Sequence, residues 1–151
     1  MTYVLGIDSS TQSCKAVLVD AATGEIVEQA RASHPGGTQV DPAEWIAALE
    51  KATDGLLEKA DAVAVAGQQH GMVSLDKDSH IVRDAMLWND VSSADAAQQL
   101  VDELGGPRQT VDLTGSVLVA SFTGTKLRWL RDHEPDNAQR EIGRASCRER
   151  V

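Results

Sequence analysis

Residues 3–20, Y-V-L-G-I-D-S-S-T-Q-S-C-K-A-V-L-V-D, decide the fold of this chain. Two apolar runs, residues 3–7 and 16–19, flank a cluster of hydroxyl side chains, and this pattern predicts a strand, a polar turn and a second strand. An antiparallel hairpin of this kind directs backbone N–H groups and hydroxyls into one concavity, which suits the oxygens of a polyphosphate. Asp8, at the end of the first strand, could then hold a hydrated Mg²⁺ or face a reacting phosphoryl group. The alternative is a hairpin with a hydrophilic tip and no ligand.

The length and charge of the chain limit the partners that we expect. A chain of 151 residues is long enough for one domain with a hydrophobic core. A formal net charge of −9 leaves no basic face to neutralise the phosphates of a nucleic acid. Three Trp, one Tyr and one Phe also offer no stacking platform for single strands. Any phosphate binding must therefore be local, through N–H groups, hydroxyls and a metal ion.

The sequence shows no targeting or membrane segment. The N-terminus runs directly into a strand-like segment, without the basic and apolar regions of a secretory signal. No apolar run approaches the roughly 20 residues of a membrane span. The two cysteines, Cys14 and Cys147, have neither a disulfide pattern nor the spacing of metal ligands. We therefore expect a cytoplasmic protein with no membrane partner, in which Cys14 is a small core residue and not a nucleophile.

The next segments extend the hairpin into an α/β pattern. Residues 25–32 alternate in polarity, which predicts a third strand. Asp41 is a good N-cap residue and Pro42 a favoured first helical residue, so we expect a helix from there to about Lys59. The apolar run 62–66 does not alternate, which predicts a strand buried on both faces. Strands, a helix and a buried strand together indicate the α/β class.

Polar residues follow the expected ends of two strands. Gln69 and His70 lie between two glycines directly after the run 62–66, where open α/β sheets bind ligands, and their donors and acceptors suit sugar hydroxyls. A turn that exposes polar side chains to water is the alternative. An apolar run also precedes Trp88, Asn89 and Asp90. An aromatic ring beside polar groups is typical of a sugar-binding wall, although Trp88 could instead belong to the core.

The second half of the chain contains one further hairpin and two helices. Residues 72–83 read as strand, polar turn and strand, and residues 92–104 as a helix that ends at two glycines. A second helix is expected to follow Ser121 or Thr123 and to end before Pro135. We interpret its charged residues as a solvated face; these are Lys126, Arg128 and Arg131. His34, beside Pro and Gly, is interpreted as a solvated loop residue without a role.

Four motifs together resemble a known family. They are residues 8–13 (DSSTQS), 66–71 (AGQQHG), 87–90 (LWND), and 122–127 (FTGTKL) with 133–135 (HEP). Their order and approximate spacing resemble the N-terminal part of FGGY-family carbohydrate kinases, over residues 1 to about 140. The resemblance implies an α/β fold related to ribonuclease H and the actin-like ATPases, present here as a partial N-terminal domain.

The resemblance also implies an activity and a set of site residues. It implies ATP-dependent phosphorylation of a sugar, and the motifs are most similar to those of members that convert D-xylulose to D-xylulose 5-phosphate. Asp8 would be catalytic, near the transferred phosphoryl group and bound through water to Mg²⁺. The residues that would approach the nucleotide are Ser10, Thr11, Gln12, Ser13 and Lys15. The residues that would contact the sugar are Gln69, His70, Trp88, Asn89 and Asp90. The resemblance also allows the full-length protein to form a homodimer.

Two positions depart from the family pattern, and two alternatives stay open. The family commonly has Gly where Ser10 stands, so the turn would be strained if this position required a positive φ. Gln69 replaces the Met that is usual in the second motif, which bears on the choice of sugar. The alternatives are another FGGY kinase, for a different ketose, a polyol or an aldonate, and a non-catalytic actin-like nucleotide-binding module.

Residues 141–151, E-I-G-R-A-S-C-R-E-R-V, match no part of the kinase pattern. They read as the translation of a common sequencing adapter, and we therefore expect a non-native tail, which we leave out of the fold prediction. In the family, the carboxylate that accepts the proton of the attacking hydroxyl lies beyond the matched region. We therefore expect residues 1–151 alone to be an inactive fragment.

Overall fold

The computed structural model describes residues 1–140 and 143–145. The chain forms two compact units, Met1–Gln68 (unit 1) and Gln69–Val151 (unit 2). Most of the predicted non-native tail lies outside the described residues. None of the helices that the structure describes is long and apolar enough to cross a membrane.

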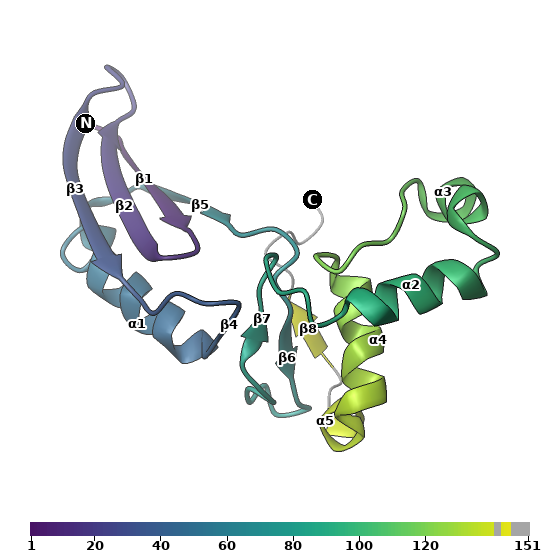
Figure 1. Ribbon diagram of the computed structural model, residues 1–151. Coiled ribbons are helices and arrows are strands. Elements are labelled where there is room, and N and C mark those ends of the chain that lie inside the picture. The colour runs from purple at the N-terminus through teal and green to yellow at the C-terminus, as the bar shows by residue number, and fades with distance from the viewer. Residues whose placement is uncertain (141–142, 146–151) are drawn as a thin grey trace. The chain divides into compact units, whose positions relative to one another are not determined.

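Unit 1 is built on a four-stranded sheet (Figure 1). The strands, in the order β3-β2-β1-β5, are β1 (Tyr3–Ser9), β2 (Ser13–Asp20), β3 (Ile26–Ser33) and β5 (Ala62–Gly67). The pairs β1–β2 and β2–β3 are antiparallel, whereas β5 runs parallel to β1. The predicted hairpin and third strand are therefore confirmed. A short strand, β4 (Gln39–Val40), precedes the helix of this unit.

The helix of unit 1, α1 (Pro42–Thr53), begins where its capping residue predicts. The Asp41 carboxylate accepts a hydrogen bond from the Ala43 N–H at 2.9 Å, which satisfies one of the donors that a helix start leaves unpaired. The helix ends earlier than expected, because the chain leaves the helical conformation before Gly55, which has a φ of +70°. Residues Leu57–Lys59 form a separate 3₁₀ turn.

The core of unit 1 lies between α1 and one face of the sheet. The helix packs against β2 and β3. The buried residues alternate along the strands, as one covered face requires. They are Leu5, Ile7, Cys14, Ala16, Leu18 and Ala32 from the sheet, with Ala48, Ala52 and Leu56 from the helix and the residues after it.

The prediction that β5 is buried on both faces is wrong. All six of its residues are exposed, and Val65 is 70% exposed. The physical reason is the position of α1, which packs against β2 and β3, whereas β5 lies at the opposite edge of the sheet in the described part of the chain. The apolar run over residues 62–66 correctly predicted a strand. It did not show whether other elements cover that strand.

Unit 2 begins with a small hairpin. The strands of unit 2 include β6 (Val73–Leu75), β7 (Ala85–Met86) and β8 (Gly143–Ala145). Strand β8 pairs antiparallel with β6. Backbone N–H groups of Asp76 and Val82 donate across the hairpin to His80 and Ser74, both at 2.9 Å. The predicted hairpin over residues 72–83 is thus confirmed.

The described part of unit 2 also contains four helices (Figure 1). They are α2 (Ala94–Glu103), α3 (Pro107–Thr114), α4 (Thr123–His133) and α5 (Pro135–Arg140). The predicted helices α2 and α4 are confirmed, and two glycines with positive φ follow α2. The helix α3, an eight-residue helix that Pro107 opens, was not predicted.

The interpretation of the charged side chains of α4 as a solvated face is wrong for two of them. Lys126 is completely buried, and the Arg128 side chain is only 14% exposed and binds the carboxylates of Glu103 and Asp132. Arg131 is exposed, as expected. The reason lies in the neighbours of α4: the Arg128 side chain reaches Glu103 of α2, and the Lys126 ammonium reaches the main-chain carbonyls of His70 and Ser121.

Candidate functional site

The polar turn between β1 and β2 is closed by short-range hydrogen bonds. The Ser10 N–H donates to the Ser13 carbonyl at 3.0 Å. The Ser10 hydroxyl donates to the Asp8 carboxylate at 2.7 Å, which orients an exposed carboxylate at the end of β1. Ser10 does not have a positive φ, so the turn is free of the strain that this conformation would impose on a serine.

Charged side chains form a row across the sheet face opposite α1. Asp8 lies directly opposite Lys15 on β2, and Lys15 lies directly opposite Arg31 on β3. Residues paired in this way share a face of the sheet. Asp8 and Lys15 also line a depression of about 520 Å³ between β1, β2 and β5. Arg31 was not predicted as a candidate residue, because only the register between β2 and β3 places it in this row.

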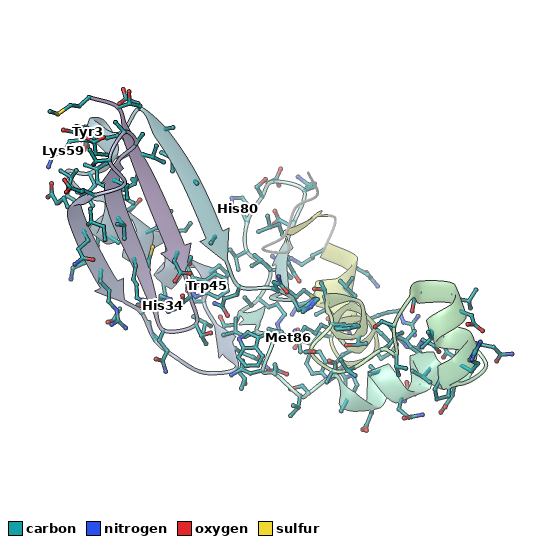
Figure 2. All side chains as sticks on the ribbon, turned by 90° about the horizontal axis from the view of Figure 1, so that it is seen from above. Tyr3, His34, Trp45, Lys59, His80 and Met86 are labelled. Carbon is teal, nitrogen blue, oxygen red and sulfur yellow. The ribbon has the colours of Figure 1, made fainter. Side chains whose placement is uncertain are left out.

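His34 is a buried residue that supports the polar turn, so its interpretation as a solvated loop residue is wrong. Its Nε2 lies 3.1 Å from the Ser10 carbonyl oxygen, and its backbone N–H donates to the Gln12 carbonyl at 3.2 Å. The ring makes an edge contact with Trp45, at 6.5 Å between centroids (Figure 2). The other ring nitrogen, Nδ1, lies 3.1 Å from the Pro35 carbonyl oxygen, so both ring nitrogens face main-chain carbonyls.

Ser13 and Cys14 continue from the turn into the interior. Both are buried. Burial, and to a smaller extent the negative charge of Asp8, raise the pKa of the Cys14 thiol above its ordinary value. A buried thiol that keeps its proton is a poor nucleophile, so the expectation of a core cysteine is confirmed.

The first polar segment of unit 2 contains Gln69 and His70, which are both exposed. His70 has a φ of +60°, a left-handed conformation that is uncommon for a residue other than glycine. Its ring lies 5.0 Å from the ring of Phe122, between centroids. A strained residue in a loop that carries candidate binding groups is consistent with a functional site.

The second polar segment follows β7. The Trp88 side chain is 50% exposed, so it is not a core residue. Asn89 is half-buried, and Asp90 is only 1% exposed. One carboxylate oxygen of Asp90 accepts the Ser92 N–H at 2.8 Å, which fixes this side chain ahead of α2.

Lys126 of α4 lies between these polar segments. Its Nζ donates to the His70 carbonyl at 2.7 Å and to the Ser121 carbonyl at 2.8 Å. Burial lowers the pKa of Lys126 to about 8, and the negative charge of Asp90 opposes that shift. The interpretation of Lys126 as a solvated residue gave no indication of these contacts, although the motif over residues 122–127 contains it.

The structure thus brings the candidate residues together in two groups, one in each unit. The group on the first hairpin consists of Asp8, Ser10, Thr11, Gln12, Ser13 and Lys15. The group in unit 2 consists of Gln69, His70, Trp88, Asn89 and Asp90, with Lys126 among them.

Comparison with known proteins identifies the family. Residues 3–143 match the N-terminal domain of the FGGY family of carbohydrate kinases. The chain belongs to this family. It is 50% identical over 143 residues to a xylulose kinase of Streptomyces coelicolor, covering 90% of this chain and 30% of that protein. It is 47% identical over 140 residues to a xylulose kinase of Streptomyces rubiginosus, covering 88% of this chain and 29% of the relative. The FGGY chain described here therefore spans about 30% of the length of these relatives.

Solved structures of FGGY kinases support the fold. A xylulose kinase from Bifidobacterium adolescentis is 42% identical and superimposes with a TM-score of 0.92, covering 97% of this chain and 32% of that one. A glycerol kinase from Plasmodium falciparum, determined with ADP, is 23% identical with a TM-score of 0.73, covering 92% and 30%. At that identity the second match shows the fold alone. The predicted α/β fold of the actin-like ATPases is confirmed for this N-terminal domain.

Proposed function

We propose that a full-length protein carrying this domain is an ATP-dependent kinase that phosphorylates D-xylulose to D-xylulose 5-phosphate. The observation that carries this proposal is the 50% identity to a protein named xylulose kinase. A solved structure with the same name, at 42% identity and a TM-score of 0.92, supports it. The named substrate of these relatives is assigned to this protein only as part of the proposal.

The polar turn of unit 1 fits the phosphate end of ATP. Asp8 offers one exposed carboxylate at the end of a strand, which fits a Mg²⁺ ion that keeps several of its waters. Lys15, directly opposite on β2, adds a positive charge for phosphate oxygens. We propose that the other nucleotide contacts come from Ser10, Thr11, Gln12 and Ser13. ATP, when bound, supplies the phosphoryl group that is transferred.

The polar group of unit 2 fits a sugar. Gln69 and His70 offer exposed donors and acceptors, and the half-exposed Trp88 ring offers an apolar face. Asn89 and Asp90 follow Trp88 directly and add an amide and a carboxylate. This mixture of one aromatic wall with several hydrogen-bonding groups is typical of a small polar ligand site.

A substrate panel on the full-length protein tests the proposal. ADP formation is measured with D-xylulose, D-ribulose, glycerol and gluconate as acceptors. We expect kcat/KM for D-xylulose to exceed that for each of the others by about 100-fold, because a site that hydrogen-bonds particular substrate hydroxyls rejects analogues that lack them. A higher kcat/KM with another acceptor would contradict the choice of sugar. ATP consumption that no acceptor changes would favour a non-catalytic nucleotide-binding module.

We further propose that residues 1–151 alone do not phosphorylate the sugar. The support is the family resemblance, in which the proton-accepting carboxylate lies outside the matched region. Product formation by the 151-residue chain, measured under the same conditions, would contradict this. Cytoplasmic location and homodimer formation stay predictions, which cell fractionation and light scattering would check.

A further inference from the structure

The buried ammonium of Lys126 joins two segments that are far apart in the sequence. Two of its hydrogen bonds end on the main-chain carbonyls of His70 and Ser121, at 2.7 and 2.8 Å. The side chain is completely buried. A buried charge is expensive, and a neutral donor could join two carbonyls at a lower cost in folding free energy. The use of a lysine at this position therefore calls for a reason besides stability.

The conformation of His70 supplies that reason. Its φ of +60° is unfavourable for a residue with a side chain, so neighbouring groups must maintain it. The Lys126 ammonium donates a hydrogen bond to the His70 carbonyl. Phe122, four residues before Lys126, contacts the His70 ring. Both the backbone and the ring of His70 are therefore fixed from the beginning of α4.

We propose that Lys126 is a positioning residue for the sugar site, whose ammonium holds the His70 carbonyl and so presents the Gln69 and His70 side chains to the sugar. This inference rests on the proposed function. Lys126 contacts the backbone behind these side chains and is not itself a catalytic residue.

The charge of the ammonium provides a second way to observe this role. Burial lowers the pKa of Lys126 to about 8, and the negative charge of Asp90, from the segment after β7, opposes that shift. At neutral pH the ammonium is charged, and its bonds to the carbonyls are charge-assisted. Above about pH 8 the charge is lost, so sugar binding is expected to weaken there.

The main experiment compares Lys126→Met with Thr125→Val in the full-length protein. Thr125 is the buried neighbour whose hydroxyl lies within hydrogen-bond distance of the Val119, Ala120 and Phe122 carbonyls, so its substitution removes a buried hydroxyl of α4 while the Lys126–His70 hydrogen bond stays. We expect Lys126→Met to raise the KM for D-xylulose by roughly 10- to 100-fold, because small misplacements of binding groups have effects of this size. The KM for ATP should change less than about two-fold, and Thr125→Val should lower Tm with the sugar KM unchanged.

Two results would overturn the positioning role. One is a wild-type sugar KM in Lys126→Met, and the other is an equal rise of that KM in Thr125→Val. Wild-type turnover is measured first. An active wild type with an unaltered Lys126→Met variant contradicts the positioning role alone, whereas a wild type without sugar-dependent turnover contradicts the proposed function as well.

Lys126→Arg keeps the inference falsifiable if Lys126→Met does not fold. Arginine stays charged at all accessible pH values. We expect kcat/KM of the wild type for D-xylulose to fall above about pH 8, and we expect Lys126→Arg to lack this fall. The same alkaline fall in both proteins would show that Lys126 is not the group that titrates.

Discussion

The polar turn of unit 1 and the polar group of unit 2 are built in different ways. In the turn, the central contacts join close neighbours, such as the Ser10 hydroxyl and the Asp8 carboxylate, and Asp8 is exposed. In unit 2, the central contact joins Lys126 to His70, 56 positions away, and the charged groups Lys126 and Asp90 are buried. An exposed carboxylate suits a hydrated, highly charged ligand, whereas buried charges suit the precise placement of hydrogen-bonding groups around a neutral one.

Removal of the Asp8 carboxylate should give the largest effect. We expect Asp8→Ala in the full-length protein to lower kcat by roughly 1,000-fold, because charge stabilisation by such groups dominates phosphoryl transfer. The change in unfolding free energy should stay within about 0.5 kcal/mol, because Asp8 is exposed. Steady-state kinetics measures kcat, and chemical denaturation measures the unfolding free energy. Glu25→Ala, at another exposed carboxylate, is the control. Retention of most of the activity would count against the role proposed for the turn.

Substitution of His34 should have a smaller effect, and this effect should be confined to the binding of ATP. His34→Phe keeps an aromatic ring beside Trp45 but loses the contact of Nε2 with the Ser10 carbonyl. We expect the KM for ATP to rise by about 10-fold and the unfolding free energy to fall by about 1 kcal/mol, because the partly buried Ser10 carbonyl loses the 3.1 Å contact and is left with the longer one from Gln68 Nε2 at 3.4 Å. Steady-state kinetics with each substrate varied in turn measures the shift. His34→Gln, whose amide N–H₂ can replace the lost donor, should recover most of the affinity, and a rise in the sugar KM alone would contradict the comparison.

The buried ammonium of Lys126 in unit 2 should make the stability of the protein depend on pH. The folded pKa of Lys126, about 8, lies below its ordinary value of 10.5, so the unfolded chain binds more protons between these values. Burial of the ammonium therefore costs stability below about pH 8, and that cost disappears as the pH rises toward 10.5. Urea denaturation from pH 7 to 10.5 should show the wild type gaining stability relative to Lys126→Met. Parallel curves for the two proteins would show that the buried ammonium does not titrate in this range.

The smallest effect is expected at Ser10. Because Ser10 does not have a positive φ, Ser10→Gly should relieve no strain and should lower the unfolding free energy by about 0.5–1 kcal/mol through backbone entropy. Ser10→Ala separates this effect from loss of the hydrogen bond to Asp8. Thermal denaturation of the three proteins measures the difference. A more stable glycine variant would mean that the turn stores strain, as His70 does.

The parts of the fold that the sequence predicts are those with local causes. The first hairpin follows from two apolar runs around a polar turn, and the start of α1 follows from Asp41 and Pro42. The helix α3 was missed because its eight residues form too short a pattern. The exposure of β5 could not be predicted either, because burial depends on where α1 packs.

The same distinction applies to the candidate site. The polar residues next to the strand ends could be found from their positions in the sequence. The supporting residues could not, because His34 and Lys126 make their hydrogen bonds to carbonyls 24 and 56 positions away. Main-chain carbonyls occur at every residue, so no side-chain pattern marks those partners.

The central claim is that the turn of unit 1 serves the nucleotide and the polar group of unit 2 serves the sugar. Calorimetric titration of D-xylulose into the full-length protein without ATP tests it most directly, with the wild type, His34→Phe and Lys126→Met side by side. We predict that His34→Phe binds the sugar with the wild-type Kd and that Lys126→Met binds it at least about 10-fold more weakly. Weaker sugar binding by His34→Phe, together with an unchanged Kd for Lys126→Met, would contradict the claim.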